Sequence, residues 1–203
     1  MNKNKLWFKR VLSDVALSMV DEIITNPDHR RHIEDKEMKL IKKGVEKGII
    51  KTEGNLFILK TDTSKRYDAF TLNREYFTQF AALISLISDY KYPLKNCQFE
   101  YHLMDICVFK NKKPFIYAEA KINNYLVEKL YKDITEKYCK NVDSFKGVPD
   151  RGNDVLRKAK YIFKDRPGYF WLVAPRQKLS FKIRYTKKGF NLHKIPDIPL
   201  FTK

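Results

Sequence analysis

Two carboxylates and a lysine stand at the ends of two apolar segments between residues 104 and 121. Asp105 opens the first segment, and Glu119 and Lys121 close the second. Carboxylates held close together repel each other unless a cation lies between them, and hard oxygen ligands around an open position suit Mg²⁺. An adjacent ammonium group can orient or deprotonate an attacking water and offset charge that develops on phosphorus. This combination is typical of a site that hydrolyses phosphodiester bonds.

The pairing of the two segments decides whether the three side chains meet. Side chains alternate between the faces of a strand, so Glu119 and Lys121 share a face. A three-residue loop at 111–113 would place Asp105 opposite Glu119. A two-residue loop would turn Asp105 to the other face. The site therefore requires an odd-numbered loop or a β-bulge that corrects the register.

The elements around these segments predict an α/β (α+β) fold with a mixed sheet flanked by helices. Apolar spacing predicts a helix over 74–90, and Asn123 or Asn124 can cap a helix that follows the hairpin. Asn153 can cap another helix that reaches residue 164. The predicted strands cover residues 97–103, 105–109, 115–121, 168–175 and 179–185.

The N-terminal third predicts a separate small module. Apolar periodicity indicates helices over 8–24 and 28–46, and a Glu-Gly-Asn turn predicts a β-hairpin over 48–60. This order resembles a winged-helix arrangement, although a small helical subdomain with a capping hairpin fits equally well. The polar stretch 61–74 is the predicted connector. We therefore expect a module at 1–65 and a sheet domain at 66–203.

An Asp followed by a β-hairpin that ends in Glu-Ala-Lys, with a helix before and a helix after, resembles the PD-(D/E)XK nuclease superfamily. This superfamily includes restriction endonucleases, Holliday-junction resolvases and repair nucleases. As architecture the resemblance runs from Arg74 onward, and as sequence it consists of Asp105, Glu119 and Lys121. Met104 stands where the family pattern has Pro. The resemblance implies a restriction-endonuclease-like core.

The same resemblance assigns roles to individual residues. Asp105 and Glu119 would bind Mg²⁺, for which Mn²⁺ would substitute, the Ala120 carbonyl would add a ligand, and Lys121 would assist the attacking water. Many such enzymes use a further acid from the first helix or strand of the core. Glu100 and Glu75 are the candidates for this metal ligand, and Glu100, being close to Asp105 in sequence, is preferred.

The charge of the chain favours a polyanionic partner. Lys and Arg outnumber Asp and Glu by 41 to 24, which gives a net charge of +17, and double-stranded DNA is the expected partner. The candidate phosphate contacts are Lys129, Lys132, Lys140, Lys146, Arg151, Arg176 and Lys178. Without a membrane-spanning run or a signal-peptide core, a cytoplasmic location is expected. Cutting both strands of a duplex would favour a homodimer.

The cysteines and histidines predict neither disulfides nor a zinc site. Cys97, Cys107 and Cys139 are scattered and odd in number, so we expect reduced structural thiols. His29 and His32 are close, but no second ligand pair accompanies them. Three functions thus remain: a metal-dependent DNA endonuclease of restriction, resolvase or repair type, a DNA-binding regulator or structural protein without catalysis, and an RNA-directed nuclease.

Overall fold

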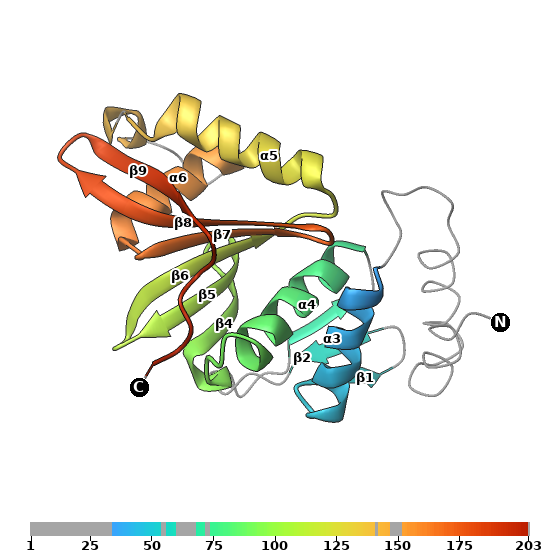
Figure 1. Cartoon of the computed structure of the whole chain (residues 1–203). Helices are drawn as coiled ribbons and strands as arrows, with labels where there is room; N and C mark the ends of the chain where they lie inside the picture. Colours follow the sequence, from blue (N-terminus) through green and yellow to red (C-terminus); the bar gives the residue numbers. More distant parts are fainter. Residues whose placement is uncertain are drawn as a thin grey trace. The chain divides into compact units, whose positions relative to one another are not determined.

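The structure is a computed structural model that describes residues 34–53, 56–59, 68–71, 74–140, 142–146 and 152–202 (Figure 1). By their contacts the described residues group into two compact units that divide between Lys95 and Asn96. The helix predicted over 8–24, and the first residues of the helix predicted over 28–46, lie outside the described residues.

The first unit combines two helices with a small antiparallel sheet. Helix α3 (Asp35–Glu46) precedes strands β1 (Ile50–Glu53), β2 (Leu56–Leu59) and β3 (Asp68–Thr71), and helix α4 (Arg74–Ser88) follows. The order β1-β2-β3 confirms the predicted hairpin. The prediction of a plain connector over 61–74 is wrong, because β3 lies within it and pairs with β2.

Helix α4 packs against α3 within this unit. The Thr78 hydroxyl of α4 donates to the buried Glu37 carboxylate of α3 at 2.9 Å, and a Cβ atom on Gly44 would come within 2.8 Å of the Ile84 side chain. These contacts group α4 with the first unit, whereas the sequence pattern grouped the helix over 74–90 with the strands that follow it and set a boundary between residues 65 and 66.

The second unit is built on a six-stranded mixed sheet, which makes the protein an α/β protein with four α-helices in its described part. A 3-10 turn (Leu94–Asn96) leads into the sheet. Its strands, in spatial order, are β4 (Cys97–Tyr101), β5 (Met104–Lys110), β6 (Lys113–Ala120), β7 (Tyr169–Ala174), β8 (Gln177–Thr186) and β9 (Gly189–Ile195). Strands β6 and β7 are parallel, and the other neighbours are antiparallel. All the predicted strands of this unit are present, and β9 is an additional one.

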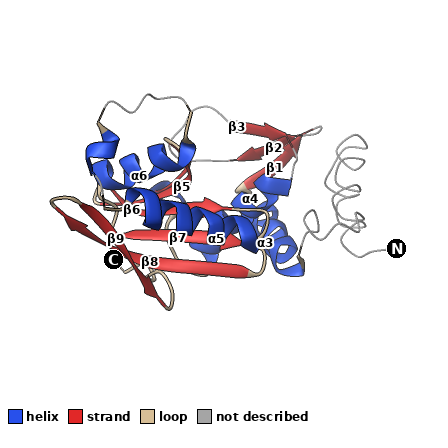
Figure 2. Cartoon of the chain, turned by 90° about the horizontal axis from the view of Figure 1, so that it is seen from above, coloured by secondary structure: helices blue, strands red, loops and turns tan. Residues whose placement is uncertain are grey.

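Two helices connect β6 to β7 and lie along the same face of the sheet (Figures 1 and 2). They are α5 (Asn124–Asp133), which continues as a π-helical segment (Ile134–Tyr138), and α6 (Asp154–Asp165), with a short 3-10 turn (Val142–Phe145) between them. The predicted N-caps are confirmed: Asn123 accepts from the Leu126 N–H at 2.9 Å, and Asn153 accepts from the Leu156 N–H at 3.2 Å.

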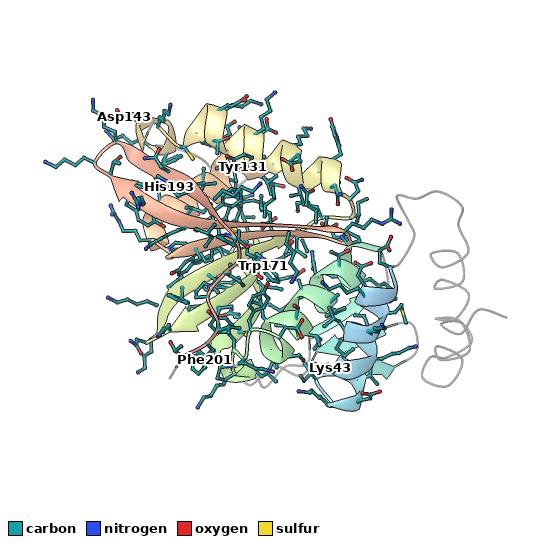
Figure 3. The ribbon with its side chains drawn as sticks, in the orientation of Figure 1. Lys43, Tyr131, Asp143, Trp171, His193 and Phe201 are labelled. Carbon is teal, nitrogen blue, oxygen red and sulfur yellow. The ribbon has the colours of Figure 1, made fainter. Side chains whose placement is uncertain are left out.

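The core of this unit lies between the two helices and the sheet. Buried residues of α5 and α6, including Val127 and Ile162, pack with Phe170 and Phe181 of the strands. Tyr131, labelled in Figure 3, stacks its ring on Phe181 at 4.8 Å between centroids. The apolar stripe of each helix therefore packs the helix on one face of the sheet. This packing positions the end of β6 and the start of β7, which the helices connect.

The cysteines behave as the sequence predicts. Cys97, Cys107 and Cys139 are buried and form no disulfide. Burial raises the pKa of Cys97 to about 12, so its thiol stays protonated near neutral pH. In the part of the chain that the structure describes, no helix is long and apolar enough to cross a membrane.

We expect Gly189→Ala to lower the free energy of unfolding by about 2 to 3 kcal/mol. A Cβ atom at Gly189 would lie 1.9 Å from the Cys139 carbonyl oxygen, which accepts from the Phe190 N–H at 2.9 Å. Gly168→Ala is the matched control, since its Cβ would meet Phe115 atoms only at ordinary contact distances from 3.6 Å. Urea unfolding of both variants measures the difference, and equal midpoints would contradict the expectation.

Candidate active site

A β-bulge sets the register of the hairpin that carries the candidate residues. The turn at 111–112 has two residues, both with positive φ, as two-residue hairpin turns of type I′ require. Phe109 pairs with Pro114, but Val108 pairs with Ile116, so one extra residue is accommodated in β6. Proline cannot donate to the ladder and is tolerated at such bulges. The bulge supplies the register correction that the two-residue turn makes necessary.

The corrected register places Asp105, near the start of β5, opposite Glu119, near the end of β6. The Ala120 N–H donates to Asp105 Oδ2 at 2.7 Å, and the Asp105 N–H donates to Glu119 Oε1 at 3.3 Å. Cys107 and Tyr117, two residues farther along each strand, belong to the core beneath α5 and α6. Both carboxylates therefore lie on the helix-covered face, as the prediction required.

Two lysines hold the Glu119 carboxylate, which is entirely buried. Lys121 Nζ lies 3.0 Å from Oε2, and Lys158 Nζ lies 2.5 Å from Oε1. Lys158 also donates to the carbonyl oxygen of Leu103 at the turn before β5. Glu119 and Lys121 meet as predicted, and the site contains a second ammonium group.

Sequence reasoning missed Lys158 as a site residue. It treated the stretch 156–166 as a source of solvated cations that could contact phosphates. The signal was the helical period: Lys158 falls on the same stripe as Val155, Ala159 and Ile162. A lysine on the buried stripe of an amphipathic helix needs an acidic partner in the sheet beneath it, because an unpaired charge is costly to bury.

The two carboxylates have opposite pKa shifts. Burial by itself would raise the pKa of Glu119, but the ammonium groups of Lys158 and Lys121 outweigh it and hold that pKa below its ordinary value. Burial, followed by the charge of Glu119, raises the pKa of Asp105 to about 7. The two lysines oppose this rise without cancelling it. Glu119 is thus ionised at neutral pH, and Asp105 is poised to lose its proton when another cation approaches.

The donor set fits a hard divalent cation. Glu119 Oε2 is buried and accepts no hydrogen bond, although the Lys121 ammonium lies beside it. Asp105 and Glu119 supply carboxylate oxygens from neighbouring strands, and the Ala120 carbonyl belongs to the same strand end. Oxygen ligands of this kind suit Mg²⁺ or Mn²⁺.

Both predicted additional acids, Glu100 and Glu75, lie among the described residues. Among the described residues, no three His, Cys, Asp or Glu side chains converge as a metal site would require. Glu100 lies on β4 beside Asp105 but is exposed, and its φ of 49° interrupts the regular strand. Glu75 is exposed at the start of α4 in the first unit. The roles of Glu100 and Glu75 as metal ligands therefore stay predictions.

Three of the predicted phosphate contacts are exposed on α5 and on the turn that is hydrogen-bonded to it. Lys129 and Lys132 lie on α5, the helix that begins just after Lys121. Arg176 lies in the β7–β8 turn, and the neighbouring Gln177 donates to Glu128 of α5 at 2.5 Å. This hydrogen bond fixes the turn beside the first half of α5.

The other predicted contacts lie elsewhere. Lys178 is placed over the Trp171 ring at 5.2 Å, on the face of the sheet opposite to the candidate site. Lys140 and Lys146 are exposed beyond the far end of α5, roughly 20 Å along the helix at 1.5 Å per residue. Arg151 lies outside the described residues. The phosphate contacts predicted for these four residues stay predictions.

We expect Asp105→Asn to raise the free energy of unfolding by about 2 kcal/mol at pH 8 without divalent ions. The folded-state pKa of about 7 exceeds the ordinary 3.8, so the protonated carboxyl favours the folded state at low pH. This stability is lost as the pH rises from about 4 to 7, and the variant avoids the loss. Urea unfolding between pH 4 and pH 8 should show a gap that widens until about pH 7.

Asp143→Asn is the control for this measurement. Asp143 is exposed, and its hydrogen bond with Lys146 lowers its pKa, so replacing it should give no gain at pH 8. If Asp105→Asn also gave none, Asp105 would not be buried beside Glu119.

No protein-family model, curated protein or solved structure matches this chain. The geometry of the site is therefore the basis for assigning a function.

Proposed function

We propose that this protein is a metal-dependent nuclease that hydrolyses phosphodiester bonds in double-stranded DNA. The observation that carries the proposal is the bulge-corrected pairing of β5 and β6, which brings Asp105 and Glu119 to one strand edge with Lys121 beside them. Without the bulge, the two-residue turn would direct the Asp105 side chain to the other face of the sheet. The net charge of +17 supports a polyanionic substrate.

The order of elements in the second unit supports a PD-(D/E)XK-like core as part of this proposal. Three antiparallel strands precede a helical connection, and the next strand pairs in parallel with the third. The aspartate lies near the start of the second strand, and the Glu-Ala-Lys sequence ends the third. This order of elements supports the proposal, because the sequence resemblance implies the same order.

The residues of the chain have separate tasks in the proposed reaction. Bound Mg²⁺ would polarise a phosphate oxygen and lower the pKa of a coordinated water. Asp105, Glu119 and the Ala120 carbonyl would hold the ion. Lys121 has a side chain that is 20% exposed, so its ammonium can reach the attacking water and offset charge on the phosphate. Lys129, Lys132 and Arg176 would bind the flanking backbone.

The test is cleavage of supercoiled plasmid and of labelled duplex DNA by the full chain. We expect cleavage with Mg²⁺ or Mn²⁺, none with EDTA, and none with Glu119→Gln. Binding without cleavage in every divalent metal would contradict the proposal and favour a non-catalytic DNA-binding regulator.

Labelled RNA of the same sequence belongs in the same experiment, and selective cleavage of RNA would redirect the proposal to an RNA nuclease. Sedimentation with and without DNA tests the expected homodimer.

A further inference from the structure

Lys158 is the most deeply buried lysine or arginine of the described second unit. It is 9% exposed, and its ammonium bonds both Glu119 Oε1 and the Leu103 carbonyl. Helix α6, which carries it, is tied to the sheet again where the Tyr117 hydroxyl donates to Asp165. The ammonium of Lys158 is thus fixed by a main-chain carbonyl and by one oxygen of Glu119.

We propose that Lys158 is the fixed second cation of the centre, so that the site binds a single divalent ion. This inference rests on the proposed nuclease function. In two-metal sites, two ions about 3.5 to 4 Å apart share the charge of the carboxylates and the phosphate. Here the ammonium of Lys158 binds Oε1 of Glu119, and the divalent ion would bind Oε2.

The ligands that a second ion would need are already engaged. Glu119 Oε1 accepts from Lys158 and from the Asp105 N–H, and the Leu103 carbonyl accepts from Lys158 as well. Among the described residues no third acidic side chain converges on the pair. Glu119 Oε2 faces only the ammonium of Lys121, at 3.0 Å, and is the oxygen that remains for an ion.

The charges of the described site lead to the same result. Once Asp105 is ionised, the two carboxylates balance the two ammonium groups, and the net charge of the site without a divalent ion is close to zero. One divalent ion gives the site the positive charge that attracts a phosphodiester, whereas a second ion would lie close to two ammonium groups without a new carboxylate to offset it. Lys158 acts through Glu119 and is a positioning residue: it keeps the carboxylate oriented with Oε2 toward the ion.

The test counts bound ions directly, without relying on cleavage. Mn²⁺ titration of the full chain, followed by electron paramagnetic resonance of the free ion, should give one tight site per chain that Glu119→Gln abolishes. Lys158→Arg keeps a cation and should keep this stoichiometry. Lys158→Gln keeps a donor but removes the charge, so the first ion should bind at least 5-fold more tightly, by about 1 kcal/mol, and a second ion should become detectable.

The outcomes separate this inference from the proposed function. Two tight ions per wild-type chain, both lost in Glu119→Gln, with metal-dependent cleavage intact, would overturn the role of Lys158 and leave the nuclease standing. Unchanged Mn²⁺ binding in Lys158→Gln would do the same. No Mn²⁺ binding and no cleavage by the wild type would overturn both. The wild-type stoichiometry decides the question even if a Lys158 variant fails to fold.

Discussion

Lys121→Met should reduce the single-turnover rate of DNA cleavage at saturating Mg²⁺ by at least about 100-fold, the effect expected for losing a positioned acid–base or charge-stabilising group. The Lys121 ammonium lies at the open end of β6, 3.0 Å from Glu119 Oε2. Without it, the ammonium that remains is that of Lys158, which is less exposed and is bound to Glu119 Oε1 and to the Leu103 carbonyl. Glu119 would keep its bond to Lys158, so the fold and the metal ligands should survive.

Metal binding distinguishes this loss from damage to the site. Because the variant loses a positive charge next to the ion, Mn²⁺ should bind at least as tightly as in the wild type. Lys164→Met, which removes an exposed lysine of α6, is the control and should cleave at the wild-type rate. Wild-type cleavage by Lys121→Met would remove this lysine from the mechanism.

Glu119→Leu should cost about 3 to 5 kcal/mol of folding free energy, the range for removing one partner of a buried ion pair. The variant leaves Lys158 nearly buried beside an apolar side chain, with only the Leu103 carbonyl as an acceptor among its observed bonds. Lys158→Met leaves Glu119 with Lys121 still in place, so its loss should be smaller. Urea unfolding of both variants gives the two values.

The double variant Glu119→Leu/Lys158→Met separates the structural role of the pair from its functional role. Replacing a buried ion pair by apolar side chains of similar volume is often neutral or stabilising, so the double variant should recover most of the lost stability. It should still neither bind Mn²⁺ nor cleave DNA. If the two single losses simply added, the two side chains would not be paired in solution.

The sequence predicted the elements of the second unit well because their signals are local. Asn123 and Asn153 are N-caps as expected, and the strands around Asp105 and Glu119 have the expected faces. The sequence also identified the register as the condition for the site. The sequence could not show whether an odd-numbered loop or a β-bulge sets the register. The bulge near Pro114 depends on the hydrogen bonds between β5 and β6.

The missed features depend on partners distant in sequence. Strand β9 has only a short alternation at Phe190 and Leu192, and it becomes a strand by pairing with β8. Strand β3 is hidden in a polar stretch and forms against β2. Lys158 looked like a surface lysine because its acidic partner is 39 positions away. In each case tertiary pairing overrides a weak local signal.

The parallel pairing of β6 with β7 has a consequence for when the site can form. Residue 116 pairs with residue 169, so both intervening helices must be synthesised before β7 can add to the sheet. Contacts with such long sequence separation form late, because closing the intervening chain costs entropy before it is rewarded. Until α6 has been synthesised, Glu119 lacks its ion pair with Lys158. We therefore expect a nascent chain that ends before α6 to be catalytically silent, so that completed synthesis itself delays activity.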